Sequence, residues 1–153
     1  MSLSTNLVDL PGEAVVMRVL RRIAEHFPQN GNGPSRTAFR LTTTDYIDAA
    51  RRGIPPLLSV FDQRRTTLAQ ARALRGCHDA TAVFGLRVSD VIGIQVAGRP
   101  ALRVVEDPLP SERGPGAEGH AGIAGLEVLP KQPKHLLKQV QQLLANCCFP
   151  LGD

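Results

Sequence analysis

The 153-residue chain is long enough to form one domain that buries most of its surface. Hydrophobic residues make up 42% of the sequence and charged residues 21%, a balance that excludes an intrinsically disordered chain. The net charge of +4 comes mainly from arginine, whose guanidinium group suits phosphate and carboxylate, although a GC-rich genome alone also enriches arginine. Aromatic residues are only 4% of the chain, so few rings are present for bases to stack on and nucleic acid ranks below other partners.

Membrane and metal signals are weak in this sequence. No basic segment followed by an apolar core comes after Met1, and no apolar run approaches the roughly 18 residues of a membrane span. The three cysteines, at 77, 147 and 148, have the spacing of neither a zinc site nor a redox motif, and the four histidines are scattered. We therefore expect a cytoplasmic protein with free thiols and with no membrane attachment, metal or cofactor.

Apolar spacing and capping residues predict the elements of the first half. Apolar residues recur at helical spacing between Pro11 and Pro28, which predicts a helix over residues 13–27, with the arginines on its opposite face. Alternating valines in the same stretch also fit a strand, and that alternative stays open. The following elements are expected next: a strand at 38–41, a helix at 45–52 capped by Thr44 and stopped by Gly53, a strand at 57–61, a helix at 68–75 capped by Thr66 or Thr67, and a strand at 81–86.

The second half begins with a short helical turn expected over 90–92 and a hairpin over 95–105. Residues 107–118 are too rich in proline and glycine for regular structure and predict a mobile loop at about 107–119. Residues 121–129 are expected to return to the sheet. The clearest element is a helix over 134–148, whose apolar arc should cover the sheet and hold Cys147 as a buried, inert thiol.

Together these elements predict a single α+β domain over residues 1–153. Its sheet is expected to be mixed or mostly antiparallel and to be covered by N- and C-terminal helices. Disorder of residues 1–10 is left open.

His120 is the leading candidate for a functional residue. It lies between Gly119 and Ala121, and such small neighbours leave the imidazole accessible to a ligand. Imidazole titrates near neutrality and can act as a general acid or base. Either Glu106 or Asp107 could orient the ring if the two ends of the intervening loop lie side by side in the sheet. In the alternative, His120 binds a backbone carbonyl and only fixes the loop before it.

Ser59 and several arginines complete the candidate site. Ser59 lies in an otherwise apolar strand, where a hydroxyl needs a partner or a ligand; a satisfied core serine is the alternative. If the first element packs beside the strand at 38–41, Arg36 is expected to converge on the sheet with Arg21, Arg22 and Arg40, the three chosen as ligand-binding residues. Paired guanidinium groups there would bind phosphate or carboxylate. The alternative for the arginines is a solvated helix face and charges on an edge strand.

Five short blocks of the sequence span most of the chain: Arg21-Arg22-Ile23, Ala38-Phe39, Leu58-Ser59-Val60, Asp107-Pro108 and His120-Ala121. In these blocks the sequence resembles a family of small uncharacterised bacterial proteins, a resemblance that implies no particular reaction. It also resembles small α+β toxin domains that use Arg, Ser and His against nucleotides, although the catalytic Glu motif of that class is missing here.

Two functional hypotheses follow from these residues. In the first, a small bacterial protein binds or acts on an anionic ligand, such as a nucleotide or phosphate, through His120, Ser59, Asp107 and the arginines. In the second, an accessory or antitoxin-like protein without catalytic activity docks a protein partner through the 107–118 loop. A pocket in which the site residues converge would favour the first hypothesis, and an exposed apolar patch would favour the second.

Overall fold

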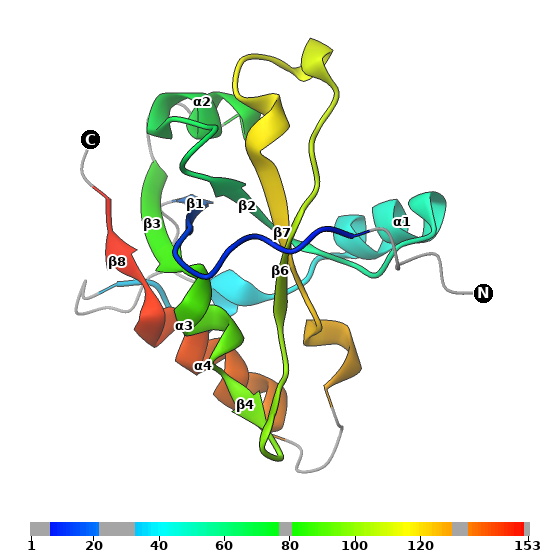
Figure 1. Cartoon of the computed structure of the whole chain (residues 1–153), viewed down its shortest axis with the longest axis vertical. Coiled ribbons are helices and arrows are strands. Elements are labelled where there is room, and N and C mark those ends of the chain that lie inside the picture. The colour runs from blue at the N-terminus through cyan, green and yellow to red at the C-terminus, as the bar shows by residue number, and fades with distance from the viewer. Residues whose placement is uncertain (1–6, 22–32, 77–80, 130–134, 152–153) are drawn as a thin grey trace.

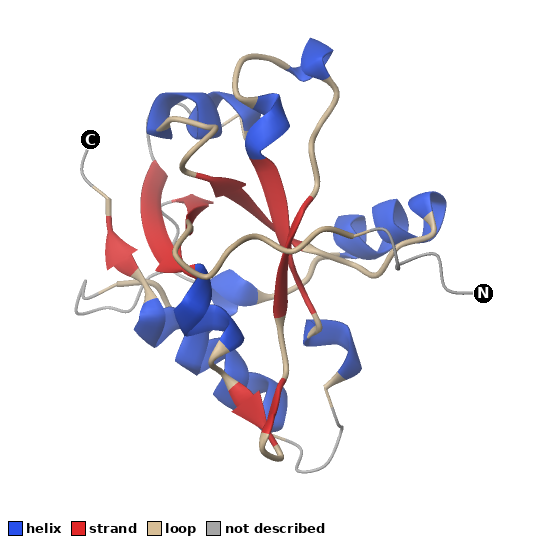
Figure 2. Ribbon diagram, in the orientation of Figure 1, coloured by secondary structure: helices blue, strands red, loops and turns tan. Residues whose placement is uncertain are grey.

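A six-stranded antiparallel sheet forms the centre of the molecule, with the strand order β6-β7-β2-β1-β3-β8 (Figures 1 and 2). The computed structural model describes residues 7–21, 33–76, 81–129 and 135–151. The strands of the sheet are β1 Val15–Arg21, β2 Leu58–Asp62, β3 Thr81–Arg87, β6 Arg103–Glu106, β7 His120–Ala124 and β8 Phe149–Pro150. The predicted α+β class is confirmed, and the described sheet is antiparallel throughout.

Short helices and one small ribbon surround the sheet. The α-helices are α1 Thr43–Arg52, α2 Leu68–Leu74, α3 Val88–Ile92 and α4 Leu136–Cys147. The ribbon pairs β4 Gln95–Val96 with β5 Arg99–Pro100, as the hairpin prediction expected. The 3-10 turns are η2 Arg36–Phe39, η3 Ser111–Arg113, η4 Ala117–Gly119 and η5 Leu126–Val128.

Local capping signals account for the helix ends. Thr67 caps α2 through a capping box with Gln70, as predicted. The cap of α1 is Thr42 rather than the predicted Thr44, because Thr42 forms the capping box with Asp45. Gly53 ends α1 with a φ of 68°, a left-handed conformation that glycine adopts without strain.

Two predictions for the first forty residues are wrong. The expected helix over 13–27 is strand β1 as far as Arg21, paired with β3 along its whole length; the remainder lies outside the described residues. Both faces of β1 are buried, so its apolar residues follow no single period and helical spacing arises by coincidence. The expected strand at 38–41 is the turn η2, because Ala38 and Phe39 are packed into the core beside α4. No N-terminal helix therefore covers the described sheet.

The two faces of the sheet are covered differently (Figure 1). One face carries a continuous core, in which Leu58, Val60 and Ile123 pack with Val140 and Leu144 of α4. The opposite face carries two smaller clusters. One joins Met17, Phe61 and Val83 to Ala71 of α2, and the other joins Leu57, Val105 and Ala124. The alternation of each strand assigns Ser59 and His120 to this second, discontinuous face.

The 107–118 segment is folded against its surroundings. It contains the turns η3 and η4, so the expectation of no regular structure is wrong, whereas its mobility stays a prediction. The Asp107 amide donates to the His120 carbonyl at 3.0 Å, and the Thr66 hydroxyl donates to the Gly116 carbonyl at 2.7 Å. The first bond holds the two ends of the loop together at the start of β7, and the second ties the loop to the segment between β2 and α2.

Candidate functional site

Strands β2 and β7 bring Ser59 and His120 together. Phe61 pairs with His120 and Ser59 with Gly122, so Ser59 and His120 lie diagonally on the same face. The Ser59 Oγ atom lies 2.8 Å from His120 Nε2. The edge of the Phe61 ring packs on the imidazole at 5.2 Å between ring centroids, which restricts rotation of the histidine.

The second nitrogen of His120 faces two acceptors from one residue. Its Nδ1 atom lies 2.8 Å from the Asp107 carbonyl oxygen and 3.3 Å from Asp107 Oδ2. A nitrogen between two oxygen acceptors must carry a proton, so in neutral His120 the proton is on Nδ1. Nε2 is then an acceptor, and the Ser59 hydroxyl donates to it. The structure therefore brings Ser59, His120 and Asp107 into one hydrogen-bonded row.

Asp107 is held ionised by charged neighbours. Arg52 donates to both of its carboxylate oxygens and also to Asp48 at 3.0 Å. Burial alone would raise the pKa of Asp107, but the hydrogen bonds from His120 and Arg52 outweigh it and lower the pKa to about 2. The same pairing raises the pKa of Arg52. Asp107 is thus a fixed anion at the end of the row.

The small residues around His120 serve packing rather than access. A Cβ atom on Gly119 would lie 1.9 Å from Thr66 Oγ1, and one on Gly122 would lie 2.6 Å from the Leu57 Cβ. Glycine lets Thr66 and Leu57 approach the backbone on either side of the histidine. Exposure of the imidazole comes instead from a pocket: the His120 side chain is 11% exposed.

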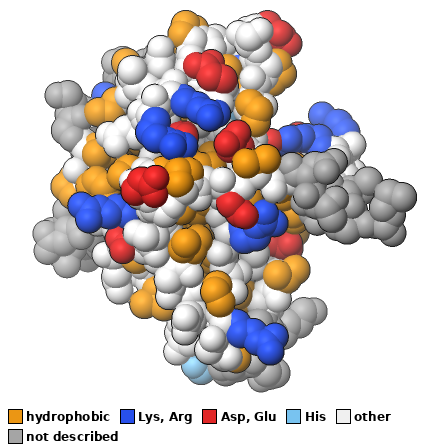
Figure 3. Space-filling view, in the orientation of Figure 1, with side chains coloured by type: hydrophobic (Ala, Val, Ile, Leu, Met, Phe, Trp, Pro, Cys, Tyr) orange, Lys and Arg blue, Asp and Glu red, His pale blue; other side chains and the backbone are white. Residues whose placement is uncertain are grey.

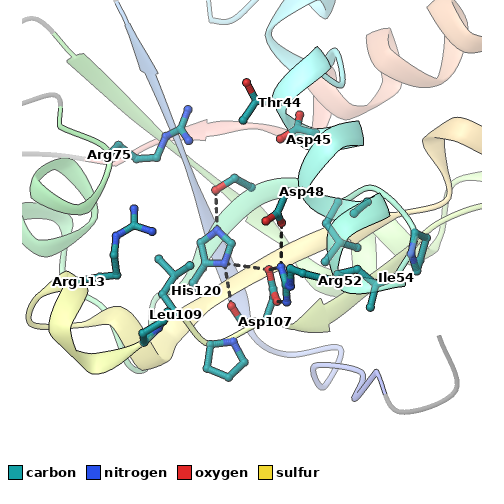
Figure 4. A pocket seen from close by; sticks show the side chains of 16 residues that line it. Thr44, Asp45, Asp48, Arg52, Ile54, Arg75, Asp107, Leu109, Arg113 and His120 are labelled. Atoms are coloured by element: carbon teal, nitrogen blue, oxygen red, sulfur yellow. Dashed lines mark hydrogen bonds and ion pairs between the residues drawn. The ribbon is translucent and has the colours of Figure 1, made fainter. Parts of the chain in front are cut away.

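This pocket has a volume of about 560 Å³ and lies between α1, the start of β2 and the loop after β6 (Figure 4). Its apolar side chains include Ile54, Leu57 and Leu109. Ser59 and His120 line the pocket, and Arg75 and Arg113 extend into the space beside the His120 ring (Figure 4). The lining therefore combines apolar side chains, a paired hydroxyl and imidazole, three guanidinium groups and three carboxylates.

The one arginine chosen for ligand binding whose side chain is described does not line this pocket. Arg40 is exposed after η2 and lies outside the lining, and its role in ligand binding stays a prediction. Arg21 ends β1, its side chain is not described, and Arg22 lies outside the described residues. The expected convergence required a helix at 13–27 and a strand at 38–41, and neither forms. Arg52, Arg75 and Arg113 line the pocket instead.

Arg18 is a further residue that the sequence reasoning missed. The ladder between β1 and β2 ends at Met17 and Phe61, and the Arg18 guanidinium fills the gap beyond it. It donates to the Ala38 carbonyl at 2.9 and 3.2 Å and to the Ser59 carbonyl at 2.7 Å. Burial, with a smaller contribution from Arg75, lowers its pKa to about 10. A lone arginine inside the apolar run 14–20 was the available signal.

The described residues give no sign of a metal centre. Among them, no group of three or more His, Cys, Asp or Glu side chains lies close enough together to hold a metal ion. Cys147 and Cys148 are half-buried free thiols, and burial raises the pKa of Cys148 to about 12, which disfavours the reactive thiolate. No helix in the described part of the chain has the length and apolar character needed to span a membrane.

The chain matches no protein-family model, and no curated protein or solved structure is significantly similar to it.

Proposed function

We propose that this protein binds a small molecule in which an anionic group, such as a phosphate or carboxylate, is joined to an apolar body. The observation that carries this proposal is the pocket, in which Arg113 and Arg75 extend beside the Ser59–His120 pair and to whose lining apolar side chains also contribute. Guanidinium groups bind phosphate and carboxylate through charge-assisted hydrogen bonds. A nucleotide has both the anion and the apolar body.

The acidic side chains of the pocket are already engaged. Asp48 and Asp107 pair with Arg52, and Asp45 accepts the Thr42 amide at 2.8 Å in the cap of α1. The buried Arg18 lies outside the pocket lining and donates to the Ala38 and Ser59 carbonyl oxygens. Arg52 is already paired with Asp48 and Asp107, so binding of an anion beside His120 depends on Arg113, with Arg75 next to it.

The surface gives less support to general nucleic-acid binding. Basic and acidic side chains are interspersed on the face seen in Figure 3, whereas electrostatic binding of a polyanion favours a continuous basic stripe. The site residues gather in a concave pocket, which favours a small ligand over the docking of a protein partner. We also propose that the protein is bacterial and cytoplasmic.

The test is a titration with ligands matched for shape. Benzoate, phenyl phosphate and adenosine monophosphate carry the anion, and benzamide is the neutral analogue of benzoate. We expect each anion to raise the melting temperature of the wild type and to bind by calorimetry, because a ligand of the native state stabilises it. Arg113→Ala should weaken binding by about tenfold, the scale of one charged hydrogen bond.

Arg99→Ala is the matched control, since Arg99 is also exposed and lies on the β4–β5 ribbon outside the pocket lining. It removes the same charge and should bind benzoate like the wild type. The proposal fails if no anion binds better than benzamide, or if the two arginine variants weaken binding equally.

A further inference from the structure

The geometry points to a hydrolytic activity at this site: we infer that Ser59 is a nucleophile, with His120 as its general base, toward small carboxylic esters that carry an anionic group. This inference rests on the proposed function, since the anion would hold the ester in the pocket. Ser59 and His120 both line the pocket, so both can touch a bound substrate. Asp107 acts through His120 and is a positioning residue.

The first requirement of such a nucleophile is an oriented base. Ser59 Oγ lies within hydrogen-bond distance of His120 Nε2, and the acceptors at Nδ1 leave Nε2 free to take the hydroxyl proton. A nucleophile bonded to a base that a third group orients is the arrangement that activates serine in unrelated folds. Here the third group supplies both its carboxylate and its backbone carbonyl.

The second requirement is stabilisation of negative charge near the serine. The Arg18 guanidinium donates to the Ser59 carbonyl at 2.7 Å and so fixes the backbone of this residue, but it lies outside the pocket lining and its N–H groups are directed at carbonyl oxygens. On the pocket side, Arg113 extends beside the Ser59–His120 pair, with Arg75 next to it (Figure 4). A guanidinium N–H that reaches the carbonyl oxygen of the ester would stabilise the oxyanion that forms during acyl transfer.

The reaction proceeds in two balanced steps. Ser59 Oγ forms a bond to the ester carbonyl carbon as His120 Nε2 takes its proton; the bond to the leaving oxygen then breaks, and that oxygen receives the proton from His120. An acyl-serine remains. Water then attacks the acyl carbon, His120 takes the water proton, and the carboxylic acid leaves as the proton returns to Ser59 Oγ.

The pocket also indicates how the ester would be held. Ile54, Leu57 and Leu109 give the lining apolar side chains that can contact a ring or an alkyl chain, and Arg113 can hold the anion. An aromatic ester bearing a carboxylate matches both. We therefore choose 4-acetoxybenzoate as the probe and 4-acetoxybenzamide as its neutral analogue.

The experiment measures release of the phenol by the full-length wild type, Ser59→Ala and Arg99→Ala. We expect the wild type to hydrolyse 4-acetoxybenzoate with saturation, and to process the neutral amide analogue about tenfold more slowly. Ser59→Ala should lower the rate by at least about 100-fold while binding benzoate normally. Arg99→Ala should retain the wild-type rate. Asp107→Asn should lower kcat and leave KM nearly unchanged.

A second readout does not depend on any variant. Phenylmethylsulfonyl fluoride should add one sulfonyl group to the wild type, mapped to Ser59 by peptide mass spectrometry, and benzoate should protect against it. Benzoate binding without turnover and without labelling of Ser59 would overturn this inference and leave the proposed function standing. The absence of anion binding would overturn both. Equal turnover by wild type and Ser59→Ala would remove Ser59 from the reaction.

Discussion

The two faces of the sheet use the same strands for different purposes. On the α4 face, Val60 and Ile123 are fully buried in a continuous core. On the other face, Ser59 and His120 come from the same two strands but lie between two small apolar clusters and open into the pocket. Helix α2 covers only the cluster around Phe61 and Met17. The comparison indicates that stability depends mainly on one face and that the chemistry lies where cover on the other face ends.

The largest expected effect comes from a substitution in the continuous core on the α4 face of the sheet. Leu144 of α4 is fully buried against the sheet. Leu144→Ala should lower the free energy of unfolding by about 2–5 kcal/mol, because a cavity is left that the core cannot refill. Urea unfolding measures this loss.

The same variant should leave the pocket on the other face of the sheet unchanged. Benzoate affinity, expressed per folded molecule, should equal that of the wild type, since Leu144 belongs to the core on the opposite side of the sheet. A parallel loss of affinity would show that the two faces are energetically coupled and would contradict their separate roles.

A smaller effect on the free energy of unfolding is expected from substitution of Asp107, which lines the pocket. Its pKa is lowered from 3.8 to about 2 in the folded protein. The unfolded chain therefore binds this proton at higher pH than the folded protein does, and stability falls as pH drops from about 4 to about 2. Asp107→Asn should cost about 2 kcal/mol at pH 7 and less as pH falls through this window. Urea unfolding at a series of pH values measures the difference.

Asp62 provides the matched control for that experiment. Burial opposes its ionisation, yet the hydrogen bonds from Arg64 lower its pKa, so Asp62→Asn should also cost stability at neutral pH. Because Asp62 lies outside the pocket lining, Asp62→Asn should keep normal benzoate binding and ester turnover. An unchanged pH dependence in Asp107→Asn would contradict the assignment of Asp107 as a paired anion.

Features that depend on neighbouring residues, such as helix ends and an apolar helix face, could be predicted from the sequence. Thr67 and Gly53 mark helix ends correctly, and the apolar arc of 134–148 predicted α4. Ser59 was singled out as a lone hydroxyl in an apolar strand, and the structure brings it to His120. The partners of Asp107 and Arg18 depend instead on strand order and register, which no local pattern contains. A strand buried on both faces, such as β1, likewise has no period that distinguishes it from a helix.

The smallest expected effect comes from Asp48, a half-exposed side chain of the pocket lining. Asp48 pairs with Arg52 at 3.0 Å across one turn of α1, but its side chain is 50% exposed. An exposed pair at this spacing contributes little, so Asp48→Asn should change the free energy of unfolding by less than about 0.5 kcal/mol. Removal of a negative charge from the pocket lining should also strengthen benzoate binding slightly, by about twofold. Urea unfolding and calorimetry at low and high salt test both. A loss above about 1 kcal/mol, or weaker benzoate binding, would mean that Asp48 holds Arg52 on Asp107. Asp48 would then be part of the hydrogen-bonded row that orients His120.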